Sequence, residues 1–227
     1  MRRTTVPVLA ATAAVLALLT GCEGDDGSAA AGAFDPAEAV AKGAGEPYAV
    51  TVKATHAGDS STITARFNLN TVYTGRWEFK DEDGNLRETV TTADAEYLRG
   101  HDATGTWLKT PRTVEVSDLD YGGYAGLLLA QGASARKGME TTDGVPTYHL
   151  AGHLGVEQLA GPLPAAHRML TSAGVTGIDL DQWIDAQGRT RHVEQAMVVE
   201  GRKDVLTLVF GDFGPAETFT APGPVAG

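Results

Sequence analysis

The chain has 227 residues, with 18 Lys and Arg against 29 Asp and Glu, so its formal net charge is −11. Such an acidic surface repels nucleic acid and anionic lipid headgroups, which argues against a nucleic-acid-binding protein and against membrane attachment through a basic patch. The single cysteine excludes an internal disulfide.

The first 21 residues have the pattern of a secretory signal. Arg2 and Arg3 precede the apolar run VPVLAATAAVLALL at positions 6–19, and the run ends in Leu-Thr-Gly-Cys at 19–22. A charged start, a short apolar segment and small residues before a cleavage point are typical of a signal peptide. The run is shorter than the roughly 20 residues that a membrane-spanning helix needs. We therefore expect residues 1–21 to be a lipoprotein signal peptide that is removed.

Cys22 is the predicted attachment point of a membrane anchor. Leu-Thr-Gly-Cys resembles the bacterial lipobox, which implies a covalent diacylglycerol on Cys22 with acyl chains such as palmitate. Two acyl chains hold a protein stably, whereas one gives only marginal binding. Without Arg2 and Arg3, 16 basic residues face 29 acidic ones, so the net charge falls to −13 and the lipid must act as the anchor. We expect the protein at the extracytoplasmic face of the cell membrane; the alternative is an ordinary signal peptide with an incidental cysteine.

One folded domain is predicted after a short linker. Residues 22–33 (CEGDDGSAAAGA) are small, acidic and without periodicity, which is typical of a flexible tether. The domain is expected over 34–222, followed by a frayed tail at 223–227. Its first element is a short helix, because Asp35 suits the N-cap, Pro36 the first helical position, and Gly43 the end.

Alternating apolar residues then predict strands at 48–55, 63–69, 73–79 and 86–90, with shorter strands at 95–98 and 106–109. Consecutive segments with period two are typical of an antiparallel meander that buries one face.

The middle of the chain has helical patterns. Ser117 is the expected N-cap of a helix that continues through Leu129, and a strand is expected at 145–151. A second helical stretch at 156–172 contains Pro162 and Pro164, which predict two short pieces with a bend. Three closing strands are expected at 178–185, 190–200 and 205–210. This order of elements predicts an α+β fold, in which the central helices cover the apolar face of an antiparallel sheet.

Three segments carry a resemblance to a known family. They read GMETTDGVPTYHL at 138–150, LDQWIDAQGR at 180–189 and LTLVFGDFG at 206–214. In this order the chain resembles the LppX/LprG-type lipoproteins of actinobacteria, within the LolA-like superfamily. The resemblance implies a curved, half-barrel sheet covered on its concave face by short helices, with the acyl chains of a lipid or lipoglycan held between them. It transfers no catalytic residue.

A lipid cavity has an apolar lining, because each methylene that leaves water gains about 0.8 kcal/mol. The candidates on strands are Val50, Val52, Ile63, Phe67 and Trp77, and those on helices are Leu127, Leu128, Met169 and Leu170. The alternative is that all nine are ordinary core and that the anchored domain binds a protein partner in the envelope. We expect a monomer in either case.

No motif for catalysis is present in the sequence. It lacks a G-x-S-x-G elbow, a phosphate-binding loop and an H-E-x-x-H motif, so we expect neither an enzyme nor a cofactor. His149 and His153 lie four apart, but nothing at supporting spacing completes a metal site, so they are expected to be surface histidines without a metal.

Two groups of acidic residues are expected to be solvated. Asp81, Glu82 and Asp83 precede Gly84 without the spacing of an EF-hand loop, which predicts a hairpin tip. The carboxylates at 179, 181 and 185 alternate with apolar residues, which predicts the wet face of a strand.

Overall fold

The computed structural model describes residues 33–58, 60–100, 106–112 and 120–226. Residues 31–227 form one compact unit, which contains all the helices and strands described below. The predicted signal peptide, Cys22, nearly all of the tether and Ser117 lie outside the described residues.

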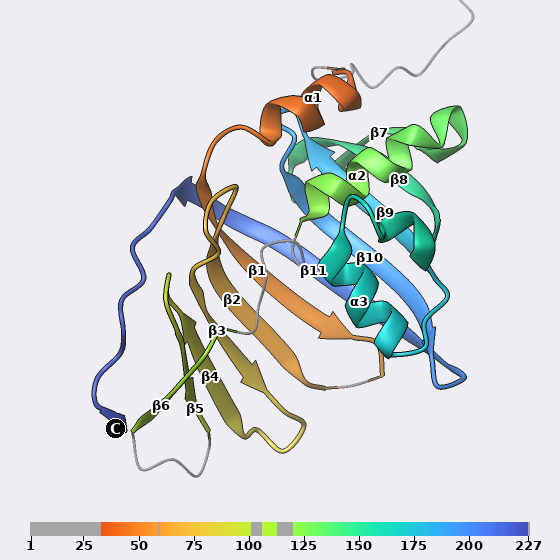
Figure 1. Cartoon of the computed structure of the whole chain (residues 1–227). Helices are drawn as coiled ribbons and strands as arrows, with labels where there is room; N and C mark the ends of the chain where they lie inside the picture. The colour runs from red at the N-terminus through yellow and green to blue at the C-terminus, as the bar shows by residue number, and fades with distance from the viewer. Residues whose placement is uncertain (1–32, 59, 101–105, 113–119, 227) are drawn as a thin grey trace, which may run out of the picture. The chain divides into compact units, whose positions relative to one another are not determined.

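One sheet dominates the described part of the chain (Figure 1). Its strands are β1 (Tyr48–His56), β2 (Thr62–Leu69), β3 (Gly75–Lys80), β4 (Leu86–Thr91), β5 (Glu96–Arg99), β6 (Trp107–Thr110), β7 (Arg136–Thr142), β8 (Val145–Gly155), β9 (Gly177–Asp185), β10 (Thr190–Val199), β11 (Arg202–Pro215) and β12 (Val225–Ala226). Their spatial order is β12-β6-β5-β4-β3-β2-β1-β11-β10-β9-β8-β7. All neighbours are antiparallel except β12 and β6, which are parallel. Two meanders therefore meet where β1 pairs with β11.

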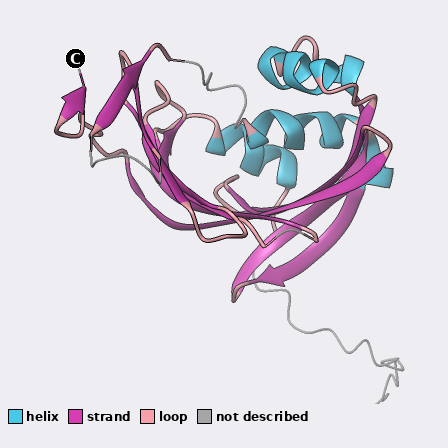
Figure 2. Ribbon diagram, turned by 90° about the horizontal axis from the view of Figure 1, so that it is seen from below, coloured by secondary structure: helices cyan, strands magenta, loops and turns pink. Residues whose placement is uncertain are grey.

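The helices lie on the concave side of the curved sheet, as Figure 2 shows. They are α1 (Pro36–Gly43), α2 (Tyr121–Ala130) and α3 (Pro164–Ser172), with 3-10 turns η2 (Gly132–Ala135) and η3 (Val156–Leu159). Helix α2 contacts β8 and α1, and α3 contacts η3. The main apolar core lies between these helices and the sheet. The predicted α+β class, with a curved sheet and helices on its concave face, is confirmed.

Local sequence signals explain where two of the helices begin. The Asp35 side chain accepts a hydrogen bond from the backbone N–H of Ala37 at 2.7 Å, and Pro36 takes the first helical position. Helix α3 begins at Pro164 after the separate turn η3, so the predicted break is confirmed. Helix α2 begins later than expected, at Tyr121, and its N-cap is Asp120, which accepts from the N–H of Gly123 at 2.9 Å.

The strands differ from the expected ones mainly beyond position 130. The hairpin β7–β8 turns at Asp143 and Gly144, which both have positive φ. The sequence does not predict strand β7, because its segment, RKGMETT, has no apolar alternation. Strand β11 is 14 residues long, although only its apolar centre at 205–210 is expected from the sequence.

The C-terminal segment is held against the sheet, where a frayed tail at 223–227 was expected. Asn68 donates from Nδ2 to the carbonyl of Glu217 at 2.7 Å, and the N–H of Glu217 donates to Oδ1 of Asn68 at 2.9 Å. Further on, Val225 pairs with Trp107 in β6. These contacts join residues far apart in sequence, so they leave no periodic signal in the tail itself.

Candidate functional site

Most of the nine predicted cavity residues are packed in the structure. Val50, Val52, Phe67, Leu128 and Leu170 are buried in the main core, and Ile63, Trp77 and Leu127 are half-buried against it. Met169 is 54% exposed, so its side chain contributes little to that core. Whether the eight packed residues ever line an open cavity stays a prediction.

A pocket of about 410 Å³ lies at one end of this core. Its walls come from the second half of α1, the start of α2, residues of β1, β2, β10 and β11, and the turns next to β2 and β10. They are formed by Val40, Ala41, Gly43, Ala44, Tyr48, Leu69, Asn70, Asp120, Tyr121, Gly122, Gly123, Gly188, Thr190 and Phe210. Leu69, Tyr121 and Phe210 also belong to the main core. The pocket, which we call the core pocket, therefore borders the apolar interior directly.

Glycines allow α1 to close this end of the core. Gly188 lies in the turn between β9 and β10 with φ of 74°, and a Cβ atom there would clash with the carbonyl of Ala39 in α1. A Cβ on Gly43 would lie 2.8 Å from the carbonyl oxygen of Gln187. The helix can rest on this turn only because both positions lack a side chain.

A buried amide lies next to the core pocket. Gln182 donates from Nε2 to the carbonyl of Tyr121 and to Oγ1 of Thr190, both at 2.8 Å, and these two residues line the pocket. Its Oε1 has no hydrogen-bond partner within the described residues. Buried carbonyl oxygens are normally satisfied, so this end of the core retains a polar acceptor beside its apolar wall.

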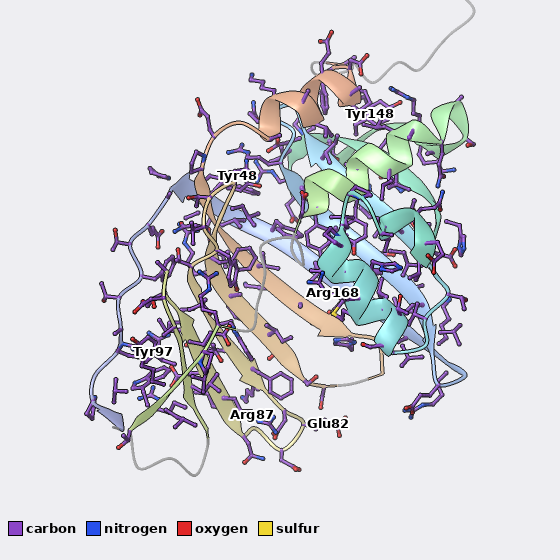
Figure 3. The ribbon with its side chains drawn as sticks, viewed as in Figure 1. Tyr48, Glu82, Arg87, Tyr97, Tyr148 and Arg168 are labelled. Atoms are coloured by element: carbon purple, nitrogen blue, oxygen red, sulfur yellow. The ribbon has the colours of Figure 1, made fainter. Side chains whose placement is uncertain are left out.

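A second, more open pocket of about 550 Å³ adjoins the first, and we call it the rim pocket. It is formed by Lys42, Gly43, Glu46, Pro47, Tyr48, Gln187, Arg189, Phe213, Gly214 and Pro215. Gly43 and Tyr48 line both pockets. Figure 3 shows Tyr48 at the end of the sheet where β1 begins beside the end of β11. Burial raises the pKa of Tyr48 to about 12, although the charge of Arg189 opposes this shift, so the phenol remains a hydrogen-bond donor at neutral pH.

Asp185 was expected on the solvent-exposed face of a strand, and this expectation is wrong. The residue is 1% exposed. Its Oδ1 accepts from the N–H groups of Gln187 and Arg189, both at 3.0 Å. Its Oδ2 accepts from Nε of Arg189 at 3.1 Å and from Nε of Arg191 at 2.9 Å. The hairpin turn that follows β9 folds back over the carboxylate, and strand alternation alone does not reveal this.

The second and third family-like segments meet at this carboxylate. Arg189 and Arg191, held by Asp185, lie over the ring of Phe213 at 4.5 and 4.4 Å from its centroid. The ring of Tyr48 is 5.8 Å from that of Phe213. The two segments are separate patterns in the sequence, and strand β10, which pairs with both β9 and β11, brings them close in the folded sheet.

The histidine pair lies outside the linings of both pockets, and each ring is within hydrogen-bond distance of at least one carboxylate. In His149, Nδ1 is 2.8 Å from Oε1 of Glu140 and Nε2 is 2.7 Å from Oδ1 of Asp181. Its ring stacks on Trp183 with centroids 4.3 Å apart. Hydrogen bonds from Trp183 and His149 lower the pKa of Glu140. Among the described residues, no group of three His, Cys, Asp or Glu side chains is arranged to hold a metal ion.

Comparisons with known proteins give similarities of fold only. No family model and no curated protein sequence matches the chain. The solved structure of LprF from Mycobacterium bovis matches with a TM-score of 0.47 and 14% identity, over 84% of this chain and 99% of that one. LppX from Mycobacterium tuberculosis matches at 0.43 and 15% identity, over 79% and 96%. MucB in complex with MucA(peri) matches at 0.32 and 16% identity, over 83% and 58%.

LprF and LppX, which are lipoproteins of the type that the three sequence segments resemble, are among the matching structures. All three identities lie below 25% and all three TM-scores below 0.5. A function for this chain must therefore come from its own residues. Within the described residues, no helix is long and apolar enough to span a membrane.

Proposed function

We propose that the protein is a lipid-anchored, extracytoplasmic lipoprotein that binds the acyl chain of a lipid between its helices and its sheet. The core pocket carries this proposal. Its volume of about 410 Å³ lies within the roughly 300–1,000 Å³ of small-molecule sites, and its wall includes Val40, Leu69 and Phe210. An acyl chain that enters it contacts side chains of the core itself and gains about 0.8 kcal/mol per buried methylene.

Deeper entry requires movement of α2, because Leu128 of that helix is fully buried against the sheet. The helix contains Gly122, Gly123 and Gly126, and each glycine lowers helix stability by about 1 kcal/mol relative to alanine. We expect α2 to open at lower cost than the strands, so that Val50 and Phe67 become the wall that a long chain meets.

The anchor places this site near its ligand. A tether of about a dozen residues reaches on the order of 20 Å, which keeps the domain close to the headgroups. Replacement of Cys22 by Ala should move the protein from the membrane fraction to the soluble fraction. If the Cys22→Ala protein stays with the membrane, lipidation of Cys22 is not the anchor.

Lipid binding is tested with the full chain carrying Cys22→Ala, so that the covalent acyl chains are absent. Native mass spectrometry should show co-purifying lipid, and a fluorescent fatty acid should bind. Ala41→Trp places a large ring in the core pocket from an exposed position of α1, and should abolish the uptake. Ala37→Trp, on an exposed position of the same helix outside the pocket, is the matched control.

A protein-interaction module is the second candidate function. The observation that favours it is the tight packing of five predicted cavity residues, of which Val50 and Leu128 are fully buried. In this case native mass spectrometry of the Cys22→Ala protein gives only the mass of the bare chain. Neither this protein nor its Ala37→Trp control then takes up the fatty acid. That result would remove the lipid proposal and leave the packed domain as a docking module.

A further inference from the structure

We propose that the rim pocket binds a phosphate group, carried by the headgroup of the lipid whose acyl chain occupies the core pocket. The inference deepens the proposed function and rests on it. Four features support it: an excess of positive charge, fixed guanidinium groups, a shared wall with the core pocket, and a volume of about 550 Å³.

The charges around the rim pocket do not balance. Asp185 provides one negative charge, but it is shared by the guanidinium groups of Arg189 and Arg191. Lys42 adds a third positive charge in the pocket wall, and Glu46 adds a second negative one. The charged side chains in the wall of the rim pocket itself, Lys42, Arg189 and Glu46, sum to a charge of about +1, in a chain whose formal net charge is −11. Asp120, in the wall of the core pocket, adds a negative charge that acts on Tyr48. An anion is therefore favoured locally although the protein as a whole repels it.

The guanidinium groups are held in place before any ligand arrives. Arg189 is bonded to the buried carboxylate of Asp185 through Nε, and its plane lies over Phe213. Its side chain remains 27% exposed, so part of it is still accessible. Its Nη2 donates to Oε1 of Gln187 at 3.2 Å, so among the described residues Nη1 is the guanidinium nitrogen without a partner and can donate to a phosphate oxygen. A fixed arginine loses little rotamer freedom on binding.

The ligand is inferred to be amphiphilic because the two pockets share a wall. Gly43 and Tyr48 line both, so a molecule in the core pocket has its polar end at the rim. The apolar residues Val40 and Leu69 belong only to the core pocket, whereas Lys42 and Arg189 belong only to the rim pocket. The core pocket also has Asn70, Asp120 and Thr190 in its wall, but the cationic side chains of the two linings both lie at the rim, which is where a phosphate joined to an acyl chain would be placed.

The test compares three probes on the full chain carrying Cys22→Ala: lysophosphatidic acid, the monoacylglycerol with the same acyl chain, and inorganic phosphate. Lysophosphatidic acid should bind at least tenfold more tightly than the monoacylglycerol, as one charge-assisted hydrogen bond implies. If inorganic phosphate displaces lysophosphatidic acid at micromolar concentration, the site recognises free phosphate; displacement only at far higher concentration identifies the lipid headgroup as the source. Both results support a phosphate site.

Two variants locate the effect. Lys42→Gln and Arg189→Gln should each lower the affinity for lysophosphatidic acid about tenfold and leave the affinity for the monoacylglycerol unchanged. Lys53→Gln, at an exposed position of β1 outside both pockets, is the matched control and should change neither. Lys42 is exposed, so its variant still tests the site if Arg189→Gln does not fold.

Two results would overturn the phosphate inference while acyl-chain binding stands. One is equal affinity for lysophosphatidic acid and the monoacylglycerol. The other is an equal loss of affinity for both probes in the two variants. If neither lipid binds, the proposed function itself fails.

Discussion

Replacing Asp185 by Asn removes the one negative charge that holds Arg189 and Arg191 at the end of β9. The asparagine keeps the volume and retains an oxygen that can accept from the backbone N–H groups of Gln187 and Arg189. It loses both charged contacts at Oδ2. Breaking a fully buried ion pair costs about 3–5 kcal/mol. Because the two arginine side chains are 27% and 20% exposed, water screens part of this loss.

We therefore expect Asp185→Asn to lower the free energy of unfolding by about 2–3 kcal/mol. Urea unfolding followed by tryptophan fluorescence should show a lower midpoint with an unchanged slope, since the unfolded surface is the same. Asp179→Asn is the matched control on the same strand. That carboxylate is exposed, and its one ion-pair partner among the described residues is His153, so the loss of stability should be within about 0.5 kcal/mol. Equal losses in the two variants would refute the structural role assigned to Asp185.

Three further predictions concern other parts of the fold. Gly188→Ala should destabilise the protein by about 2 kcal/mol or more, because the position has a positive φ and the new Cβ clashes with Ala39. Gly126→Ala in α2 places its Cβ in open space and should stabilise the protein by up to about 1 kcal/mol. Thermal unfolding of both variants checks the two signs. The pKa of Glu140 is lowered in the folded protein, so this side chain contributes stability above pH 4.5, its ordinary pKa, and the contribution is lost as the pH falls through the lower folded pKa. Glu140→Gln should therefore flatten the dependence of Tm on pH below 4.5. A profile equal to that of the unmodified protein would contradict this role of Glu140. Asn68→Ala removes two hydrogen bonds to the backbone of Glu217 while Arg66 still binds the carboxylate, so proteolysis of the C-terminal residues should be faster but the segment should not be fully released.

Much of the sheet was predictable because its signals are local. Burial alternates along β3 and along most of β1, and each expected strand from β1 to β6 lies within a few residues of the observed one. Helix α1 has its cap and its first proline next to each other in the sequence. In both cases the sequence signal lies within the same short segment that forms the strand or helix.

The candidate site was much less predictable, because non-local contacts form it. Apolar residues such as Val52 and Leu170 are predicted as cavity lining from their strand or helix face, but a face does not distinguish a packed core from an open one. The core pocket arises instead where α1 rests on the Gly188 turn, and neither segment indicates the other. In the sequence, Gly188 indicates only a hairpin turn, because the helix that packs on it is distant along the chain.

The acidic surface and the cationic rim pocket together suggest how entry is selected. With a formal net charge of −11, the chain repels anionic headgroups over most of its surface. The rim pocket, which holds Lys42 and Arg189, shares Tyr48 with the core pocket, so under the proposed function the repulsion is weakest where an acyl chain would be buried. In that complex the apolar core would supply the free energy of binding and the rim pocket the orientation. Added salt should weaken the phosphate contact while leaving acyl burial almost unchanged, because screening acts on charges and not on methylene groups.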